Sequence, residues 1–127
     1  MPTTFKIYPD LQFVAVRYTG ETSIADIRGL TQAVIADPRV TPDFRVIIDI
    51  TGVQPTFSSA DVVQHQQWRK QRPPFAKIAV VATTELEFGL ARMFELASNS
   101  AGGVEMHTFR TVDDARQWLG LPALQAK

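Results

Sequence analysis

The sequence contains no cysteine and only two histidines. Without cysteine, the chain cannot form a disulfide framework, a thiolate metal site or a cysteine nucleophile. His65 and His107 are far apart, and neither belongs to a spacing that is typical of metal ligands. We therefore expect no metal ion and no cofactor.

The sequence also has no excess of charge and no long apolar run. Lysine plus arginine and aspartate plus glutamate number 13 each, so the formal net charge is zero. This balance argues against a general nucleic-acid binder, whose affinity depends on neutralising phosphates. No apolar run approaches the roughly 18 residues that a membrane span needs, and the first residues lack the apolar segment of a signal peptide. We expect a cytoplasmic protein.

The composition is that of an ordinary globular domain. The 127 residues are 45% hydrophobic and 20% charged. A chain of this length buries roughly two-thirds of its unfolded surface, which is enough for one core. With no repeat or linker visible, residues 1–127 are expected to form a single domain.

Apolar periodicity and turn residues predict five strands and four helices. The strands are expected at residues 5–8, 13–18, 45–50, 76–82 and 104–109, and the helices at residues 23–37, 59–71, 85–98 and 111–119. Pro9-Asp10 favours a hairpin between the first two strands, Thr22 or Ser23 can cap the first helix, and residues 101–103 form a turn. This order predicts an α/β fold with a mainly parallel sheet and an antiparallel first strand.

Two C-terminal segments carry a family resemblance. They are Phe88-Gly-Leu-Ala-Arg-Met-Phe94 and Phe109-Arg-Thr-Val-Asp-Asp-Ala-Arg-Gln-Trp-Leu119. Together with the order of elements and the length, they resemble the SpoIIAA-like or STAS superfamily, which includes the anti-anti-sigma factors. The chain is similar to a SpoIIAA-like subfamily without assigned activity, which is also likened to the lipid-carrying Sec14/CRAL-TRIO domains. The resemblance implies a SpoIIAA-like fold.

The resemblance also points to the start of the second helix. Anti-anti-sigma members carry Asp-Ser-Ser-Gly there, and the first serine is phosphorylated. This chain has Phe57-Ser58-Ser59-Ala60 at the matching positions, so the aspartate and the glycine are missing. Helix N-terminal N–H groups would favour a phosphate on Ser58, whereas capping preference alone makes Ser58 or Ser59 a simple N-cap. The second interpretation is favoured, and with it the loss of the phosphoserine switch.

Asp49 lies near the end of the third predicted strand, a position where catalytic acids often lie in α/β proteins. No nucleophile or general base is placed by the sequence to join it. We therefore expect Asp49 to stabilise the following loop by accepting N–H bonds. An enzyme is correspondingly disfavoured.

On the second predicted helix, His65, Trp68 and Arg72 share one stripe, with Arg69 beside it. Val62 and Val63 are expected to form the core face, so the stripe should point outward. Either Trp68 lies flat on the protein under snorkelling arginines, or the stripe binds a partner or an anionic ligand.

On the third predicted helix, one apolar face is expected to cover the sheet. Its members are Leu86, Leu90, Met93 and Ala97. Phe88 falls nearly opposite this face, and Phe94 and Leu96 fall on its flanks. Phe88 either folds back into the core from an irregular segment or, with Phe94, lines a self-association face or an apolar pocket.

These patterns predict a protein that acts by binding. The first hypothesis is a regulatory protein-interaction module that self-associates. The alternative is a carrier or sensor of a small apolar or lipid-like ligand, in a pocket between the second and third helices. The two hypotheses differ in the surface that they need from Phe57, Trp68, Phe88 and Phe94. A cavity lined by these residues would favour the carrier, whereas a flat patch formed by them would favour the interaction module.

Overall fold

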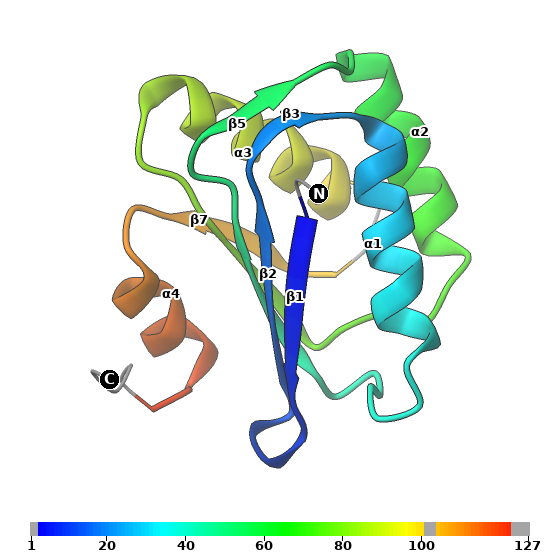
Figure 1. Cartoon of the computed structure of the whole chain (residues 1–127), viewed down its shortest axis with the longest axis vertical. Coiled ribbons are helices and arrows are strands. Elements are labelled where there is room, and N and C mark those ends of the chain that lie inside the picture. The colour runs from blue at the N-terminus through cyan, green and yellow to red at the C-terminus, as the bar shows by residue number, and fades with distance from the viewer. Residues whose placement is uncertain (1–2, 101–103, 123–127) are drawn as a thin grey trace.

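A five-stranded β-sheet forms the centre of the fold in the computed structural model, which describes residues 3–100 and 104–122. The strands lie in the order β1-β2-β4-β6-β7. Their bounds are β1 Thr3–Tyr8, β2 Phe13–Tyr18, β4 Arg45–Asp49, β6 Lys77–Val81 and β7 Met106–Phe109. β1 and β2 run side by side at one edge (Figure 1). β1 pairs antiparallel with β2 across a 3-10 turn at Pro9–Leu11, and the other neighbours pair in parallel. This confirms the predicted mainly parallel sheet and its antiparallel first strand. The turn predicted at residues 101–103 lies outside the described residues.

Four α-helices accompany the strands in this part of the chain, as predicted, and the last of them follows β7. Their bounds are α1 Ile24–Ala36, α2 Ser59–Lys70, α3 Glu85–Ser100 and α4 Val112–Leu119. Ser23 caps α1 in a reciprocal pair of bonds with Asp26, which decides between the two predicted capping residues. Gly120 ends α4 with a φ of 75°, a left-handed conformation that glycine adopts without strain.

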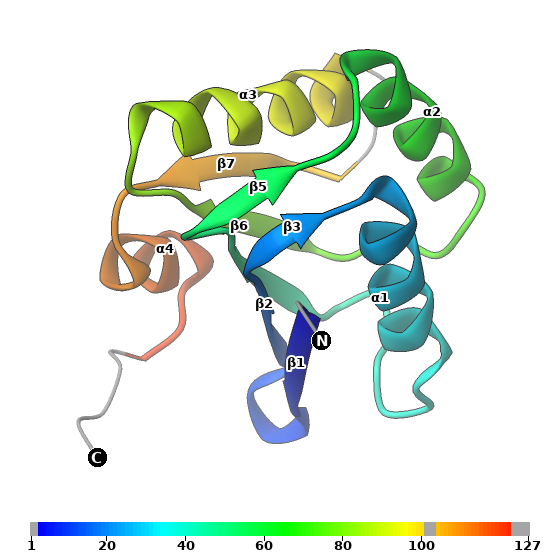
Figure 2. The same ribbon diagram turned by 45° about the horizontal axis from the view of Figure 1, so that its top comes forward.

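The helices cover the two faces of the sheet unequally. α1, α2 and α3 lie on one side and α4 lies on the other (Figure 2). Side chains alternate along β2 accordingly: Val14, Val16 and Tyr18 belong to the larger core under the three helices, whereas Phe13 belongs to the smaller core under α4.

A second, two-stranded sheet was not predicted. It pairs β3 Gly20–Thr22 with β5 Val53–Pro55, and each strand follows one strand of the main sheet in sequence. Three-residue strands leave too short a pattern to detect. Thr56 donates its backbone N–H to the carbonyl of Thr22 at 3.0 Å, so this small sheet ties the start of α1 to the start of α2.

The predicted core face of α3 is wrong in part. Leu90 packs against the core as expected, but Leu86 is 75% exposed. Phe88 and Phe94, which were expected away from this face, also pack against the core. The reason is Glu87, which turns inward to bond the backbone of the β4–β5 loop and so fixes the rotation of the helix. Phe88 reaches the core from within the helix, not from an irregular segment before it.

The predicted faces of α2 are also wrong in part. Val62 is buried as expected, but Val63 is 50% exposed and His65 is only 4% exposed. His65 points inward because its ring stacks on Trp68 and meets the edge of Phe94, with ring centroids 5.5 and 6.2 Å apart. The adjacent Val62 and Val63 do not indicate this rotation, because two neighbouring apolar residues cannot show which of them faces the core.

Candidate functional site

Helix α2 does not rest on the sheet. It packs mainly against α3 and α1. A helix seated on a sheet needs apolar residues at successive turns of one face. α2 has Val62 in the first such position, but the buried residues that follow are His65 and Gln66, and Arg69 lies one turn after His65. The inward face of α2 is therefore mostly polar.

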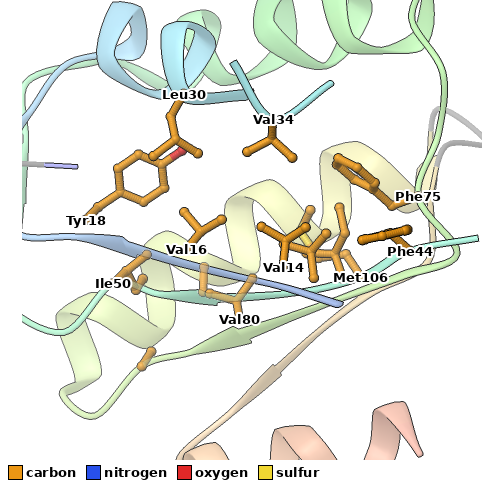
Figure 3. Close-up of a cluster of buried hydrophobic side chains, with 14 of the residues drawn as sticks. Val14, Val16, Tyr18, Leu30, Val34, Phe44, Ile50, Phe75, Val80 and Met106 are labelled. Carbon is orange, nitrogen blue, oxygen red and sulfur yellow. The ribbon is translucent and has the colours of Figure 1, made fainter. Parts of the chain in front are cut away.

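A cavity of about 500 Å³ lies between this helix and the sheet. Its floor is apolar and comes from β2, β4 and β6: Val16, Val46, Ile48, Ile78 and Val80. α1 contributes Leu30 and Val34, which point toward Val14 and Val16 of β2 (Figure 3). α3 contributes Ala91 and Phe94 to the lining. Phe57, which directly precedes the N-cap of α2, also lines the cavity.

The polar roof of the cavity contains two unsatisfied atoms. Nδ1 of His65 and Nη2 of Arg69 are buried and have no hydrogen-bond partner among residues 3–100 and 104–122. Both side chains line the cavity. Positions four apart on a helix lie on the same face, so the two groups face the same space. Buried polar atoms without partners are rare in folded proteins.

The electrostatics of the roof follow from burial. Burial, together with the nearby charges of Arg28 and Arg69, lowers the pKa of His65 to about 4, so its imidazole is neutral at pH 7. Burial and then the charge of Arg72 lower the pKa of Arg69 to about 10. Arg69 still carries its positive charge at pH 7.

Trp68 lies outside the cavity lining, between two arginines. The guanidinium of Arg72 is 4.0 Å from the Trp68 ring centroid, and that of Arg28 reaches over the ring from α1 at 5.2 Å. Arg72 also donates to the carbonyl of Trp68 at 2.8 Å. Arg28, Arg69 and Arg72 form no salt bridge with any described carboxylate. This corner of α1 and α2 is therefore positively charged and uncompensated.

Ser58, not Ser59, caps α2. Its Oγ accepts the backbone N–H of Asp61 at 3.2 Å, and the Asp61 carboxylate accepts the N–H of Ser58 at 2.9 Å. This is a capping box, and both serines are exposed. The sequence had left open which serine caps the helix.

Replacing Ser58 by alanine should cost about 0.5–2 kcal/mol of unfolding free energy, since it removes the acceptor for Asp61. Ser59→Ala is the matched control and should be near neutral. Thermal melts of the two variants measure the difference. Equal effects would show that the bond does not stabilise the helix.

Asp49 serves the loop that follows β4. Its Oδ1 accepts the backbone N–H of Thr51 at 2.9 Å, and the residue does not line the cavity. This is the arrangement that the sequence suggested for a loop-stabilising carboxylate. The described residues bring together no group of three or more histidine, aspartate or glutamate side chains that could hold a metal ion. Nor does any helix in the described ranges have the length and apolar character of a membrane span.

The predicted site residues divide into two groups. Phe57, His65, Arg72 and Phe94 line the cavity, whereas Trp68 and Phe88 do not. Phe88 lies under the guanidinium of Arg110, 4.3 Å from its ring centroid. Arg69 was expected beside the outward stripe, whereas in the structure it lines the cavity together with Gln66. The sequence of α2 did contain a sign of the cavity, because no face of this helix is apolar enough to cover a sheet.

Comparison with known proteins agrees with this fold. The family profile described as SpoIIAA-like matches residues 13–120. The chain belongs to the SpoIIAA-like family. An uncharacterised protein from the DUF3478 family of Shewanella loihica PV-4, described as having a SpoIIAA-like fold, superposes with a TM-score of 0.58. The two chains are 20% identical, and the match covers 92% of this chain and 91% of that one. Among curated proteins, none matches this chain.

The resemblance inferred from the two C-terminal segments is therefore confirmed. At 20% identity the solved structure establishes the fold and nothing about activity. The feature of this SpoIIAA-like chain that bears on its function is the cavity beneath α2.

Proposed function

We propose that this SpoIIAA-like protein binds a small apolar or lipid-like molecule in the cavity beneath α2. The observation that carries the proposal is the cavity itself, about 500 Å³ in volume and floored by aliphatic side chains. Pockets for small ligands usually measure about 300–1,000 Å³ and combine apolar walls with a few polar groups. This cavity has both properties.

Energetics support an occupant. The cavity is partly open to solvent, so water can enter it and bond to the polar roof. The aliphatic floor offers that water no hydrogen bonds, and a ligand that covers the floor gains about 25 cal/mol per Å² of apolar surface removed from water.

The test is binding of a neutral fluorescent probe, N-phenyl-1-naphthylamine, to the wild type and to Val16→Phe. Val16 lies on the cavity floor, so the larger ring should fill the site and weaken probe binding roughly ten-fold. Val63→Phe is the matched control, because Val63 is 50% exposed on the outside of α2. If Val63→Phe weakens binding and Val16→Phe does not, the ligand site is not this cavity.

A second candidate function is the regulatory interaction module that the family resemblance implies. The exposed Val63 and Leu96 support it, since both line a shallow groove between α2 and α3 together with Met93. Phe88 and Phe94, the residues first expected at such a face, pack inward instead. Self-association through α3 stays a prediction.

A further inference from the structure

We propose that the ligand is an amphipathic carboxylate, whose hydrocarbon chain lies over the sheet and whose carboxylate binds Arg69 and His65. This inference rests on the proposed ligand-binding function and names the chemical class of the ligand. It is carried by the contrast between the two walls of one cavity: an aliphatic floor and a cationic roof.

The geometry of Arg69 leaves one edge of its guanidinium for a ligand. Its Nη1 donates to the carbonyl of Pro73 at 2.7 Å and, at 3.5 Å, to that of Arg72. The ring of Phe75 lies under the guanidinium, 4.8 Å away. Nη2 is buried without a partner in the described residues. The carbonyl contacts and the Phe75 ring hold the guanidinium in place. The two N–H bonds of Nη2 remain without an acceptor among the described residues.

His65 supplies the second contact. Its Nδ1 is buried and unsatisfied, in a side chain that is only 4% exposed. A neutral imidazole can donate one hydrogen bond from this nitrogen when its other nitrogen is unprotonated. A carboxylate accepts from both Nδ1 and Nη2, which satisfies two buried donors with one group.

The charges around the cavity agree with an anion. Arg69, Lys70 and Arg72 line it, and Glu105 is the one carboxylate in its described lining. Glu105 is exposed and lies 3.2 Å from Nε2 of His107, so it has a partner of its own. The positive charge on the roof is therefore free to meet a ligand.

The experiment is calorimetric titration with sodium dodecanoate, dodecan-1-ol and dodecyl phosphate, each below its aggregation concentration. Dodecanoate should bind the wild type roughly ten-fold more tightly than the alcohol, because charged hydrogen bonds replace unsatisfied donors. Arg69→Gln should remove most of that difference and leave the affinity for the alcohol within about two-fold. Arg17→Gln is the matched control: Arg17 is exposed and does not line the cavity, and it should change neither affinity.

The outcomes separate the two proposals. Equal affinity for acid and alcohol, both lost in Val16→Phe, overturns the carboxylate and leaves the ligand site standing. Tighter binding of dodecyl phosphate overturns the carboxylate in favour of a phosphate headgroup. Failure of all three probes to bind overturns both proposals.

A second measurement needs no variant at Arg69. In a ¹³C NMR titration of carboxyl-labelled dodecanoate bound to the wild type, contact with a guanidinium should lower the carboxyl pKa below that of the free acid. An apolar site alone would raise this pKa. A raised value in the complex would therefore contradict the proposal even if Arg69→Gln does not fold.

Discussion

Glu87→Ala should lower the free energy of unfolding by about 3 kcal/mol. The Glu87 carboxylate accepts four hydrogen bonds: from the backbone N–H of Gly52 at 2.8 Å, from that of Thr83 at 3.0 Å and of Thr84 at 3.3 Å, and from the Thr83 hydroxyl at 3.1 Å. Its own N–H donates to Oγ1 of Thr84 at 3.1 Å. One side chain therefore both caps α3 and ties it to the β4–β5 loop.

Thermal melts should show the loss as a fall of roughly 10 °C in Tm. Glu85→Ala is the matched control in the same helical turn. Its side chain is 93% exposed and contacts Arg110 at 3.3 Å, so its removal should cost less than about 1 kcal/mol. Similar melting temperatures for the two variants would contradict the role given to Glu87.

The effect of Glu87 should depend on pH. The hydrogen bond from Gly52, followed by those from Thr83 and Thr84, holds the pKa of Glu87 below its ordinary value of 4.5. A carboxylate with a lowered pKa stabilises the fold fully above its unfolded pKa, and this stabilisation is lost as the pH falls through the folded pKa. The difference between wild type and Glu87→Ala should therefore shrink only in acid.

The second large effect should come from His65. In the folded protein its pKa is about 4 instead of 6.5, because it is buried and lies near Arg28 and Arg69. The unfolded chain therefore takes up a proton at a higher pH than the folded one. Stability is full above pH 6.5 and falls as the pH drops toward 4, by roughly 3 kcal/mol in total.

Urea denaturation at a series of pH values measures this loss. His65→Phe should abolish it, while its ring can still stack on Trp68 and meet Phe94. His107→Gln is the control and should behave like the wild type, since His107 lies at the partly exposed edge of the sheet beside Glu105. Parallel stability curves for wild type and His65→Phe between pH 6.5 and 4 would contradict the burial of His65.

The strands and helices could be predicted because each has a strong local signal. The apolar runs at β4 and β6 are paired on both sides in parallel, as continuous β-branched sequences suggest. Capping residues such as Ser23 and Thr111 mark the starts of helices α1 and α4. The small β3–β5 sheet could not be predicted, since its pairing depends on where α1 and α2 begin.

The rotation of α2 and α3 could not be read from hydrophobic periodicity. In α3 the inward residue Glu87 is charged, and the exposed Leu86 and Leu96 are apolar, so polarity alone points to the wrong face. The sequence Thr84-Glu-Leu-Glu87 does contain the signal, since it is a capping box. In α2 the inward stripe is polar, and because polar residues usually face solvent, periodicity points it outward.

The measurement that tests the central claim most directly is an NMR map of contacts between bound ligand and protein methyl groups. Nuclear Overhauser effects from unlabelled dodecan-1-ol to methyl-labelled protein report which side chains touch the chain of the ligand. We expect contacts to Val16, Leu30 and Val80, which line the cavity beneath α2. Contacts confined to Val63 and Leu96 would place the ligand in the outer groove and contradict the account.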